Sequence, residues 1–553
     1  MEWLALTTLV AEIESQAASE QIKPTERELR NAARRDRAFS LLLVSALTLF
    51  AVAVDGYHPF AEDGGIYMAG VERLLDPSLY PHSTTFVLEP MRHSLFAPTV
   101  AGIVRLTHLS LPVVLLALYL VSIWVTLFAA WMLASRCWAT RSARSGAVVL
   151  LACWLALPIA GTALLFMDPY ATARSFSTPA MVLALACVLE MTSGSAPFNW
   201  QERKKLRGLL LCIASLALAA AMHPLMAAYA LGATLMLLVA SSPSRTTRLY
   251  ATAALATSSL ALAACLQAIA RTEPADYVRV AMTRTYWFPL QWHWYELTGL
   301  AAPPVILLFF SRKKPVPPTH ARSLPTNDPP QALARMAIAI GAISGVIALL
   351  FSRSAAATHE IARLQPLRAF QIVYLVMILI LGAQFGERLL RRSVLRWSAT
   401  MLLLGGTMFC AERTAFPNSN HLELPWIAPH NQWVQAFQWI RANTPKDALF
   451  ALNADYINSP GEDAQCFRAI SQRSALADYS KDGGEASIAP ELTAEWVSGQ
   501  AAQNHLNAPA TTDSERIPAL LPLGVTWLVL HADASTRFDC PYSNSAVKVC
   551  KLR

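Results

Sequence analysis

Two acidic residues stand side by side in the sequence AEDGGIYMAG, which follows closely on the apolar run 40–54. A carboxylate such as that of Glu62 or Asp63 can accept a proton from a hydroxyl nucleophile, or hold a hard divalent cation against phosphate oxygens. Gly64 and Gly65 come next, and glycine favours a tight turn that aims the carboxylates back toward the apolar run. The alternative is that these acids only keep a loop solvated. An acidic pair followed by two glycines favours a chemical role.

Further acidic groups lie close to other apolar runs. Asp55 follows the first run directly, and Asp168 lies with Arg174 in the short connection MDPYATARSFS between two later runs. Ionisable side chains at the surface of a membrane bundle are candidates for function by default. An Asp-Pro helix end with an arginine that reaches for the interface explains Asp168 and Arg174 equally well. The residues alone leave both interpretations open.

Four arginines lie in the long connections between apolar runs. A guanidinium group fits phosphate oxygens in a bidentate manner, which makes these residues candidates to bind a phosphate or pyrophosphate group. Contact with phospholipid headgroups explains any single one of them as well. Arg368 is the strongest candidate, because it lies in LQPLRAF at the start of an apolar run. The other three are Arg279, Arg284 and Arg363.

A dense aromatic cluster, YWFPLQWHWYE, occupies residues 286–296. Tryptophan and tyrosine gather at membrane interfaces, and the same side chains stack against sugars in binding grooves. The residue types favour an interfacial belt without excluding a groove. His293 and Glu296 are the polar members of the cluster that a substrate would contact.

The elements that position these residues are expected to be membrane helices. The chain of 553 residues is 54% hydrophobic and 15% charged, against about 25% charged residues in soluble domains. Its apolar runs reach the roughly 20 residues that a bilayer requires. We therefore predict a mainly α, polytopic transmembrane bundle of about eleven spans. The spans centre near residues 39–54, 110–134, 146–166, 177–192, 207–222, 224–240, 249–270, 295–311, 333–351, 369–386 and 395–411.

Charge patterning sets the predicted orientation. The net charge of +8 comes from short basic clusters between apolar runs, where orientation signals lie, so it does not indicate binding of nucleic acid. These clusters fall on the side of the N-terminus, which the arginine-rich segment 1–38 holds in the cytoplasm. The acidic loop 55–110 then lies outside. This layout is typical of a protein of the bacterial inner (plasma) membrane.

The sequence changes in character after the last apolar run. Residues 431–443 have the apolar spacing of a helix, and three short runs are typical of strands. These runs are 448–453, 525–531 and 546–552. The end of the chain is therefore expected to form a small soluble α/β domain.

These observations divide the chain into three parts. They are a cytoplasmic N-terminal segment 1–38, a transmembrane domain 39–411 and an extracytoplasmic α/β domain 412–553. In an oxidising compartment Cys540 and Cys550 of the last part can pair. The nine cysteines show no spacing typical of a metal site, and the chain has no P-loop, no GxSxG motif and no dinucleotide fingerprint.

With an acidic motif after its first span, a second acid in a later outer connection and an outer C-terminal domain, the chain resembles the GT-C superfamily of membrane glycosyltransferases. The matching residues are Glu62 and Asp63 in AEDGGIYMAG, and Asp168 in MDPYATARSFS. The segments RLQPLRAFQIVYLV, TPKDALF and FRAISQRS also resemble segments of uncharacterised bacterial multi-span proteins. The motif departs from the superfamily in its Glu-Asp-Gly-Gly order, and no acceptor motif such as WWD is present.

The resemblance implies an inverting glycosyltransferase that takes a sugar from a polyprenyl-phosphate carrier and passes it to a glycan, lipid or protein acceptor. It implies Asp63 as the catalytic base or metal contact, Glu62 as its neighbour and Asp168 as the second acid. It fixes no cofactor, and Mg²⁺ or Mn²⁺ held by Glu62 and Asp63 is the candidate. The residues assigned to substrate binding are Asp55, Arg174, Arg279, Arg284, His293, Glu296, Arg363 and Arg368.

Two other classes of function are open alternatives. A non-catalytic membrane scaffold or sensor, whose outer C-terminal domain binds an envelope partner or glycan, would tolerate simultaneous changes of Glu62, Asp63 and Asp168. A secondary transporter would place charges at mid-bilayer and pair two inverted halves. Neither transporter feature is evident in the sequence, since the acids cluster on one side of the predicted membrane.

Overall fold

The computed structural model describes residues 26–192, 198–312, 328–453 and 466–552. The chain divides into two compact units, Met1–Ala46 and Leu47–Arg553, and each is described by itself. The described part of the first unit is the N-terminal stretch of helix α2 (Glu26–Asp55). Of the predicted N-terminal segment, residues 1–25 lie outside the described residues.

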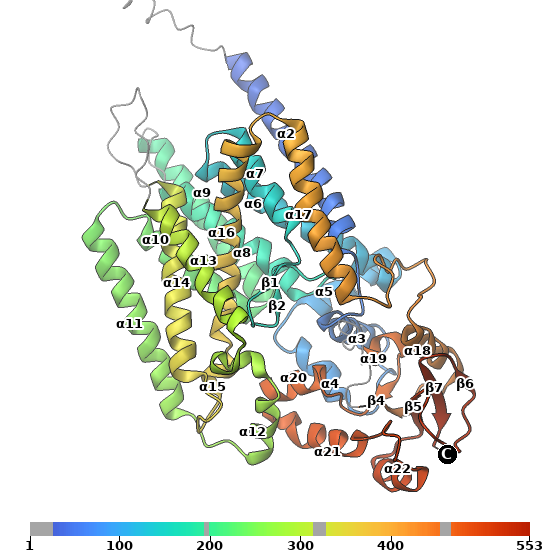
Figure 1. The fold of residues 1–553 in the computed structure, drawn as a ribbon. Coiled ribbons are helices and arrows are strands. Elements are labelled where there is room, and N and C mark those ends of the chain that lie inside the picture. Colours follow the sequence, from blue (N-terminus) through green and yellow to red (C-terminus); the bar gives the residue numbers. More distant parts are fainter. Residues whose placement is uncertain (1–25, 193–197, 313–327, 454–465, 553) are drawn as a thin grey trace, which may run out of the picture. The chain divides into compact units, whose positions relative to one another are not determined.

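Nine of the described helices are long and apolar enough to cross a membrane, by length and composition (Figure 1). The candidate spans are Arg34–Asp55, Leu111–Cys137, Ala173–Thr192, Glu202–Met222, Arg245–Ile269, Trp294–Ser311, Pro329–Phe351, Glu360–Leu390 and Val394–Ala415. The mainly helical, multi-span architecture predicted from the sequence is therefore confirmed. The number of candidate spans is smaller than the eleven that we predicted.

The predicted span 146–166 is wrong as a continuous helix. Helix α7 (Arg141–Cys153) ends in the middle of the apolar run. The strands β1 (Pro158–Ile159) and β2 (Leu164–Leu165) then form an antiparallel hairpin. Proline has no N–H for a helical hydrogen bond, and Gly161 in the turn adopts a φ of +62°. Hydropathy alone does not register this change from helix to hairpin.

The predicted span 224–240 is a separate, shorter helix. Helix α9 (Phe198–Met222) ends before His223, whose side chain accepts a hydrogen bond from the Met226 N–H, and α10 (Pro224–Ala240) begins directly after it. With 17 residues, α10 falls below the length of the nine candidate spans. The break follows from Pro224, because proline interrupts the backbone ladder of a continuous helix.

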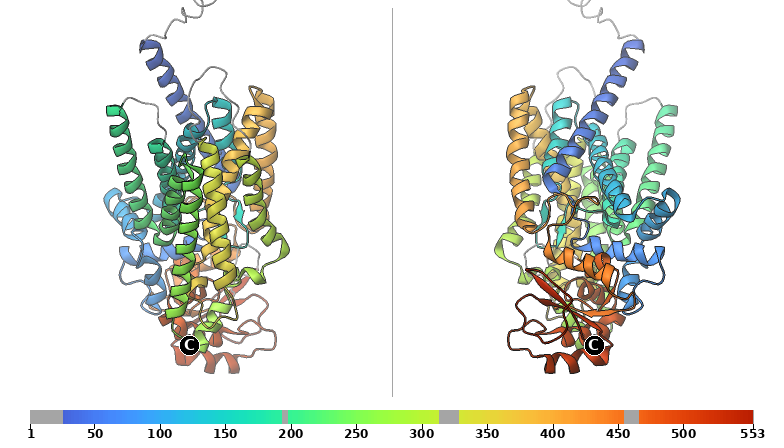
Figure 2. Two further views of the ribbon diagram at one scale, coloured as in Figure 1. Left: turned by 90° about the vertical axis from the view of Figure 1, so that its left-hand side faces the viewer. Right: turned by 90° about the vertical axis from the view of Figure 1, so that its right-hand side faces the viewer.

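Close backbone contacts hold the centre of the second unit together. Helix α7 packs along α16 (Phe370–Gln384), and α8 (Ala173–Thr192) packs along both α9 and α6 (Leu111–Cys137). Figure 2 shows the long helices of the second unit running side by side. A Cβ atom on Gly146 of α7 would lie 2.2 Å from the carbonyl oxygen of Gly382 on α16. Small residues at such positions let helix backbones approach closely in membranes.

The remaining helices of this part connect or flank the central ones. The α-helices are α3 (Asp63–Leu75), α4 (Thr84–Leu88), α5 (Phe96–Thr107), α11 (Arg245–Ile269), α12 (Ala275–Met282), α13 (Trp294–Ser311), α14 (Pro329–Phe351), α15 (Glu360–Arg363) and α17 (Val394–Ala415). Short 3-10 helices are η1 (Glu89–Met91), η2 (Thr285–Trp287), η3 (Pro289–Gln291) and η4 (Pro366–Ala369), and η5 (Phe385–Leu390) is a π-helix. Helices α3, α4 and α5 lie in the predicted acidic loop between α2 and α6.

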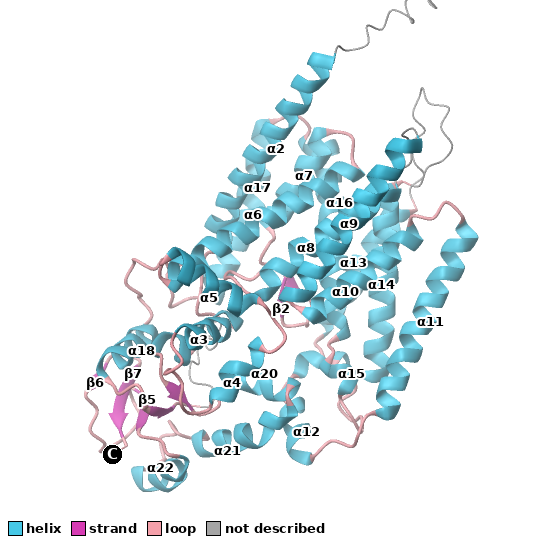
Figure 3. Ribbon diagram, turned by 180° about the vertical axis from the view of Figure 1, so that it is seen from behind, coloured by secondary structure: helices cyan, strands magenta, loops and turns pink. Residues whose placement is uncertain are grey.

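We define the C-terminal domain as α18 to β7, and a small mixed sheet lies within it (Figure 3). Its strand order is β4-β3-β5-β7-β6, with β3 parallel to β4 and β5, and with β7 antiparallel to β5 and β6. The strands are β3 (Leu449–Ala451), β4 (Ser474–Ala475), β5 (Trp527–His531), β6 (Tyr542–Ser543) and β7 (Val547–Lys551). The helices are α18 (Gln432–Asn443), α19 (Phe467–Ser471), α20 (Lys481–Ile488), α21 (Thr493–Gln503) and α22 (Asp513–Leu520), with η6 (Pro490–Leu492) and η7 (Leu521–Leu523).

The two faces of this sheet bury alternate residues, as the period of a strand requires. Phe450 and Val529 pack on one face with Phe437 of α18. Leu449 and Leu528 pack on the other face, in a second core cluster. The predicted α/β character of this region, with a helix near 431–443 and three of its strands, is confirmed.

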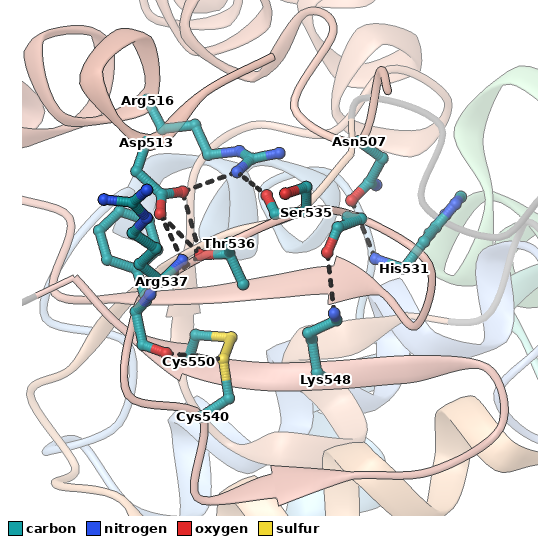
Figure 4. Close-up of a disulfide and its surroundings, with 12 residues drawn as sticks. Asn507, Asp513, Arg516, His531, Ser535, Thr536, Arg537, Cys540, Lys548 and Cys550 are labelled. Carbon is teal, nitrogen blue, oxygen red and sulfur yellow. Dashed lines mark hydrogen bonds and ion pairs between the residues drawn. A yellow bond between two sulfur atoms is a disulfide. The ribbon is translucent and has the colours of Figure 1, made fainter. Parts of the chain in front are cut away.

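A disulfide joins Cys540 to Cys550 (Figure 4). It ties the segment before β6 to β7, next to the central strand β5. The pairing that the sequence allowed is therefore present in the structure. Cys466, the remaining cysteine of this domain, is buried, and its Sγ donates to the Glu62 carbonyl oxygen at 3.7 Å.

Candidate functional site

Asp63 is the first residue of α3, where the free N–H groups of a helix end favour a negative charge. The residue before it, Glu62, has a φ of +47°, which is uncommon outside glycine. Asp63 Oδ2 accepts a hydrogen bond from Arg174 Nη1 at 2.8 Å, and Oδ1 accepts one from Lys481 Nζ at 3.5 Å. The Asp63 side chain remains 30% exposed. A reachable carboxylate is thus flanked by two cations.

Arg174, near the start of α8, joins the two acids that the sequence singled out. Its Nη2 and Nε donate to Asp168 Oδ2 at 2.9 and 3.3 Å, while Nη1 donates to Asp63. The Thr172 hydroxyl also donates to Asp168, at 3.5 Å. The Asp168 and Arg174 side chains are 6% and 10% exposed. Two carboxylates that lie far apart in the sequence therefore share one buried guanidinium group.

The surroundings move the pKa values of these two acids in opposite directions. Burial alone would raise the pKa of Asp63, but the charges of Arg174, Lys481 and Arg368 outweigh it and hold that pKa well below its usual range. Burial raises the pKa of Asp168, where Arg174 opposes the rise and the charge of Asp63 adds to it. Carboxyl pairs whose pKa values are pushed apart are typical of sites that separate acid and base roles. Asp63 is held as the carboxylate, and Asp168 takes up a proton more readily.

The C-terminal domain contributes Lys481, the first residue of α20, to the same cluster. Its ammonium group pairs with both Glu62 and Asp63, and its side chain is 15% exposed. Burial alone would lower the pKa of Lys481, but the two carboxylates raise it above its usual range. Sequence reasoning missed this residue, because it lies 418 positions after Asp63 and no local motif marks it.

Glu485, one turn further along α20, is a second group that sequence reasoning missed. Burial raises its pKa to about 8, and the charge of Asp63 adds to the effect. A carboxyl group that exchanges its proton near neutral pH is suited to acid–base work. A sequence pattern could have found α20 as a short amphipathic stretch, but not its place beside α3.

Gly64 and Gly65 have a different role from the predicted turn. Both lie inside the first turn of α3. A Cβ atom on Gly64 would lie 2.5 Å from the Pro59 carbonyl oxygen, and one on Gly65 would lie 2.1 Å from the Cβ of Cys466. The absence of side chains therefore lets α3 approach α19, with which it is in contact. The glycines position the acidic pair through close packing rather than through a turn.

Arg284, a predicted substrate ligand, is instead engaged by the C-terminal domain. Its Nη1 and Nη2 donate to the carbonyl oxygens of Ser480 and Tyr479 at 2.7 and 3.0 Å. The residue is 6% exposed. These bonds hold the segment that leads directly into Lys481. Arg284 thus supports the cluster from a distance, and its role in binding a substrate stays a prediction.

Other predicted substrate ligands lie in local structures of their own. Arg279 pairs with Asp276 on the exposed face of α12. Arg363 pairs with Glu360 and donates to the Ile488 carbonyl oxygen. Their substrate contacts stay predictions.

His293 and Glu296 form a capping box at the start of α13. The Glu296 carboxylate accepts a hydrogen bond from the His293 N–H at 2.7 Å. This reciprocal arrangement satisfies backbone donors that a helix end leaves free. The aromatic cluster around them is divided, because Trp287 and Trp292 are buried while Trp294 is 77% exposed. The cluster thus contains both buried and exposed tryptophans, and whether it forms an interfacial belt or a groove stays a prediction.

Asp55 ends α2 and is 3% exposed. Its Oδ1 has no hydrogen-bond partner among the residues that the structure describes. The charged neighbour that acts on it is Glu412 of α17, rather than Glu62 or Asp63. The structure therefore separates Asp55 from the two acids that follow it in the sequence.

Arg368 lies in η4, at the start of the helix pair η4–α16, within reach of the charges of Asp63 and Arg174. Its Nε is buried and has no hydrogen-bond partner among the described residues. A buried guanidinium N–H without a partner is costly unless a ligand or water supplies an acceptor. Among the arginines picked from the sequence, Arg368 is the one placed to offer a donor to a ligand beside the Asp63 cluster.

The described residues contain no group of three or more His, Cys, Asp or Glu side chains that could hold a metal ion. At Glu62 and Asp63, the neighbouring positive charges are those of Lys481 and Arg174. This donor set does not fit a divalent cation, because ammonium and guanidinium groups take the positions beside the carboxylates. We therefore derive no step through Mg²⁺ or Mn²⁺, which stays a prediction.

Comparisons with known proteins find likenesses among solved structures. No protein-family model matches the chain, and no curated protein sequence matches it. Among solved structures, the chain is similar to the archaeal oligosaccharyltransferase AglB from Archaeoglobus fulgidus, solved with an inhibitory peptide and a dolichol-phosphate. The TM-score is 0.41 and the identity 12%, over 90% of this chain and 70% of that chain. A likeness this distant carries no argument about the chemistry of the present site.

Proposed function

We propose that the protein is an integral membrane glycosyltransferase that moves a sugar from a polyprenyl-phosphate carrier to an acceptor hydroxyl or amide group outside the cytoplasm. The observation that supports this most is the bridge of Arg174 between Asp63 and Asp168, beside Lys481 and Arg368. The cluster places carboxylates with shifted pKa values next to three cations. That combination suits the transfer of a group from a phosphate leaving group. The GT-C resemblance of the acidic motif points the same way.

The proposed reaction is a single displacement. The acceptor oxygen or nitrogen attacks the anomeric carbon, and the bond between that carbon and the phosphate oxygen breaks with its electron pair on the phosphate. The acceptor proton passes to the Asp63 carboxylate, which acts as the general base. One displacement at the anomeric carbon inverts its configuration. The products are the glycosylated acceptor and the polyprenyl phosphate.

The cations have a double role in this scheme. Arg174, Lys481 and Arg368 stabilise the negative charge that develops on the leaving phosphate, because preorganised donors act strongly in a site with little water. A bound phosphate competes with Asp63 for Arg174 and Lys481. Since those charges hold the pKa of Asp63 low, donor binding raises the basicity of Asp63. The carboxylate becomes an effective base when the donor is in place.

A hollow beside Lys481 offers a route for the acceptor. It lies between α3 and the C-terminal domain, and its free space, the part open to solvent included, is about 510 Å³. Its lining includes Gly65, Phe86, Arg468 and Lys481. An acceptor in this hollow would lie next to Lys481, which pairs with Asp63. The C-terminal domain would then help to select the acceptor.

The test compares wild type with Asp63→Asn in lipid nanodiscs, using a panel of radiolabelled polyprenyl-phosphate sugars. We expect wild type to release or transfer one of the sugars, and Asp63→Asn to bind the carrier but lose transfer. Asp76→Asn is the matched control, because Asp76 belongs to the same loop and pairs with exposed Lys446. Unchanged transfer in Asp63→Asn would exclude Asp63 as the base. Absence of both turnover and carrier binding in wild type would favour the scaffold or sensor.

A further inference from the structure

The Lys481 ammonium group lies at the acidic pair for which the sequence predicted a divalent cation. It pairs with the Glu62 carboxylate and lies 3.5 Å from Asp63 Oδ1. The other oxygen of Asp63 accepts a hydrogen bond from Arg174 Nη1 at 2.8 Å. Hard divalent cations bind to proteins through carboxylate oxygens of this kind. Both oxygens of Asp63 are therefore already bonded to cations that belong to the chain.

Carboxylates and cations balance in this cluster without a metal ion. The carboxylates are those of Glu62, Asp63 and Asp168, and the cations are Arg174, Lys481 and Arg368. A divalent cation would bring two more positive charges close to ammonium and guanidinium groups, and like charges at such distances repel one another. A lysine brings one positive charge, which the adjacent carboxylates neutralise. The cluster therefore favours the lysine at this position over a divalent cation.

The backbone that carries Lys481 is fixed on both sides. Asp478 Oδ1 accepts hydrogen bonds from the backbone N–H groups of Lys481 and Asp482, at 2.6 and 3.1 Å. Arg284 Nη1 donates to the carbonyl oxygen of the residue before Lys481, at 2.7 Å. Arg468 donates to both carboxylate oxygens of Asp482, each at 2.7 Å. A typical ion pair on a protein surface has no such support, so the fold presents this ammonium group to the acids.

The place of Lys481 in its own helix does not account for the residue. Lys481 is the first residue of α20, and the free N–H groups at the start of a helix favour a negative charge over a positive one. A cation at this position therefore lowers the stability of the helix unless other groups compensate for it. The Glu62 and Asp63 carboxylates, which come from a distant part of the chain, are such groups. The acidic pair thus explains the lysine better than the helix does.

We propose that Lys481 takes the place of a divalent cation at Glu62 and Asp63, so that an ammonium group of the chain binds the carrier phosphate and no metal ion is needed. The inference rests on the proposed function. An ammonium group has three N–H donors, and the two carboxylates take two of them. The third can reach a phosphate oxygen, because the Lys481 and Asp63 side chains are 15% and 30% exposed. Lysine binds phosphate as a point charge, without the fixed geometry that arginine imposes.

A second lysine of the C-terminal domain provides a matched control. Lys446 also pairs with an acid of the loop 55–110, but that acid is Asp76, and both side chains are exposed. Lys481→Ala and Lys446→Ala therefore remove the same ammonium group, one at the acidic pair and one at Asp76. Lys481→Arg keeps a positive charge at the acidic pair and leaves no room for a metal ion. It separates the effect of the charge from the effect of an opened site.

The experiment measures equilibrium binding of bare polyprenyl phosphate to the full chain in nanodiscs of a zwitterionic lipid. Each measurement is made once in EDTA and once in excess Mn²⁺. The proteins are wild type, Lys481→Ala, Lys481→Arg and the control Lys446→Ala, each checked for its melting temperature. Loss of a charge-assisted hydrogen bond to the phosphate is expected to weaken binding about tenfold to a hundredfold.

We expect wild type and Lys446→Ala to bind the carrier equally well in EDTA and in Mn²⁺. Lys481→Ala should bind it more weakly by that factor in EDTA, and Mn²⁺ should restore part of the loss. One or two carboxylates together with a substrate phosphate form a set of ligands that holds such a cation. Lys481→Arg should keep most of the binding in EDTA and gain nothing from Mn²⁺.

Loss of carrier binding by wild type in EDTA, with recovery in Mn²⁺, would mean that the protein uses a metal ion. Binding by Lys481→Ala that equals wild type, or a loss that Mn²⁺ does not restore, would mean that Lys481 does not stand in for a cation. Each of these results overturns the inference while the proposed function stands. Failure of wild type to bind any carrier in either condition would overturn the proposed function and the inference with it.

Discussion

Two buried clusters of the second unit, in each of which an arginine meets an aspartate, differ in how they are closed. In the C-terminal domain, Asp513 takes hydrogen bonds from Arg516, from the Thr536 hydroxyl and from the Arg537 backbone N–H (Figure 4). Arg516 is three residues from Asp513 in the sequence and is 2% exposed. At the candidate site, Asp63 is bonded by Arg174 and Lys481, which come from distant parts of the chain.

The comparison separates a structural ion pair from a candidate functional one. A carboxylate with backbone and hydroxyl donors is fixed in place, and a ligand that competes for one cation changes little. Asp63 depends on two side chains from distant parts of the chain and remains 30% exposed, so an anion that competed for them would change its partners and its basicity. Burial and ion pairing occur in both clusters. The two clusters differ in which groups donate hydrogen bonds to the aspartate and in how far apart in the sequence those groups lie.

The largest expected effect is a difference in sugar transfer between variants of the two aspartates. Asp63→Asn should lower sugar transfer per folded molecule by about 10²–10⁴-fold, the usual contribution of a general base, and should also lower the melting temperature, because the depressed pKa of Asp63 means that its charged form stabilises the fold. Asp513→Asn should lower the free energy of unfolding by about 1–3 kcal/mol, because it disturbs the hydrogen bonds from three donor residues, and should leave transfer per folded molecule unchanged. Transfer rates and thermal unfolding in the same nanodisc preparation check both. Equal losses of transfer per folded molecule would remove the distinction between the clusters.

The next effect concerns Arg174. Arg174→Gln leaves two carboxylates without their shared cation, and breaking such a buried pair costs about 3–5 kcal/mol. Adding Asp168→Asn to that variant should restore part of the stability, since one of the uncompensated charges is gone. Denaturant unfolding of the single and double variants measures the coupling. Additive losses would show that Arg174 and Asp168 do not act on each other.

A third prediction uses pH and another acid of α3. Glu72 is 5% exposed and accepts hydrogen bonds from the Tyr80 hydroxyl and Gln472 Nε2. Burial outweighs these bonds and raises its pKa from 4.5 to about 7. The folded protein therefore keeps a proton that the unfolded chain releases, so the stability from this group falls as pH rises from about 4.5 to 7.

At roughly 1.4 kcal/mol for each pKa unit, the loss above pH 7 amounts to about 3 kcal/mol. Glu72→Gln should remove the part of this dependence that comes from Glu72, whereas Glu485, whose pKa burial raises to about 8, keeps its own part. Melting temperatures at pH 5 and pH 8 for wild type and Glu72→Gln provide the measurement. The pKa of Asp63 is depressed, so Asp63 stays charged across this range and contributes no slope. A wild-type stability that is flat between pH 5 and pH 8 would contradict the shift at Glu72.

The smallest expected effect concerns two lysines of the C-terminal domain that pair with acids of the loop 55–110. Lys481→Gln should lower transfer about tenfold, because it removes a charge-assisted hydrogen bond near the leaving phosphate. Lys446→Gln should change neither rate nor melting temperature, since its pair with Asp76 is 63% and 43% exposed. Initial rates of sugar transfer by the two variants measure this difference. Comparable losses would indicate a general effect of domain attachment.

The sequence was sufficient to predict elements whose pattern lies within one short segment. Hydropathy found the long helices, and alternation of apolar residues placed strands at 448–453, 525–531 and 546–552, close to β3, β5 and β7. Asp63 and Asp168 both follow predicted membrane helices on the same side, and for that reason the sequence analysis assigned them to one site. In the structure, Arg174 joins the two.

What escaped prediction depends on contacts between distant segments. Lys481 became visible only when α20 was placed beside α3. The capping box of His293 and Glu296 was visible in the sequence as a spacing, but its aromatic setting suggested a ligand instead.

The pairing of Asp63 with Lys481 also affects how the protein is made. During synthesis the acidic loop is made early, and its partner on α20 is produced some 418 residues later. Contacts of such long sequence separation form late, after local helices have folded. The cluster therefore remains open while the chain is still growing, and closes once Lys481 has been made and the sheet has formed. A chain interrupted before that point lacks one of the two cations that flank Asp63.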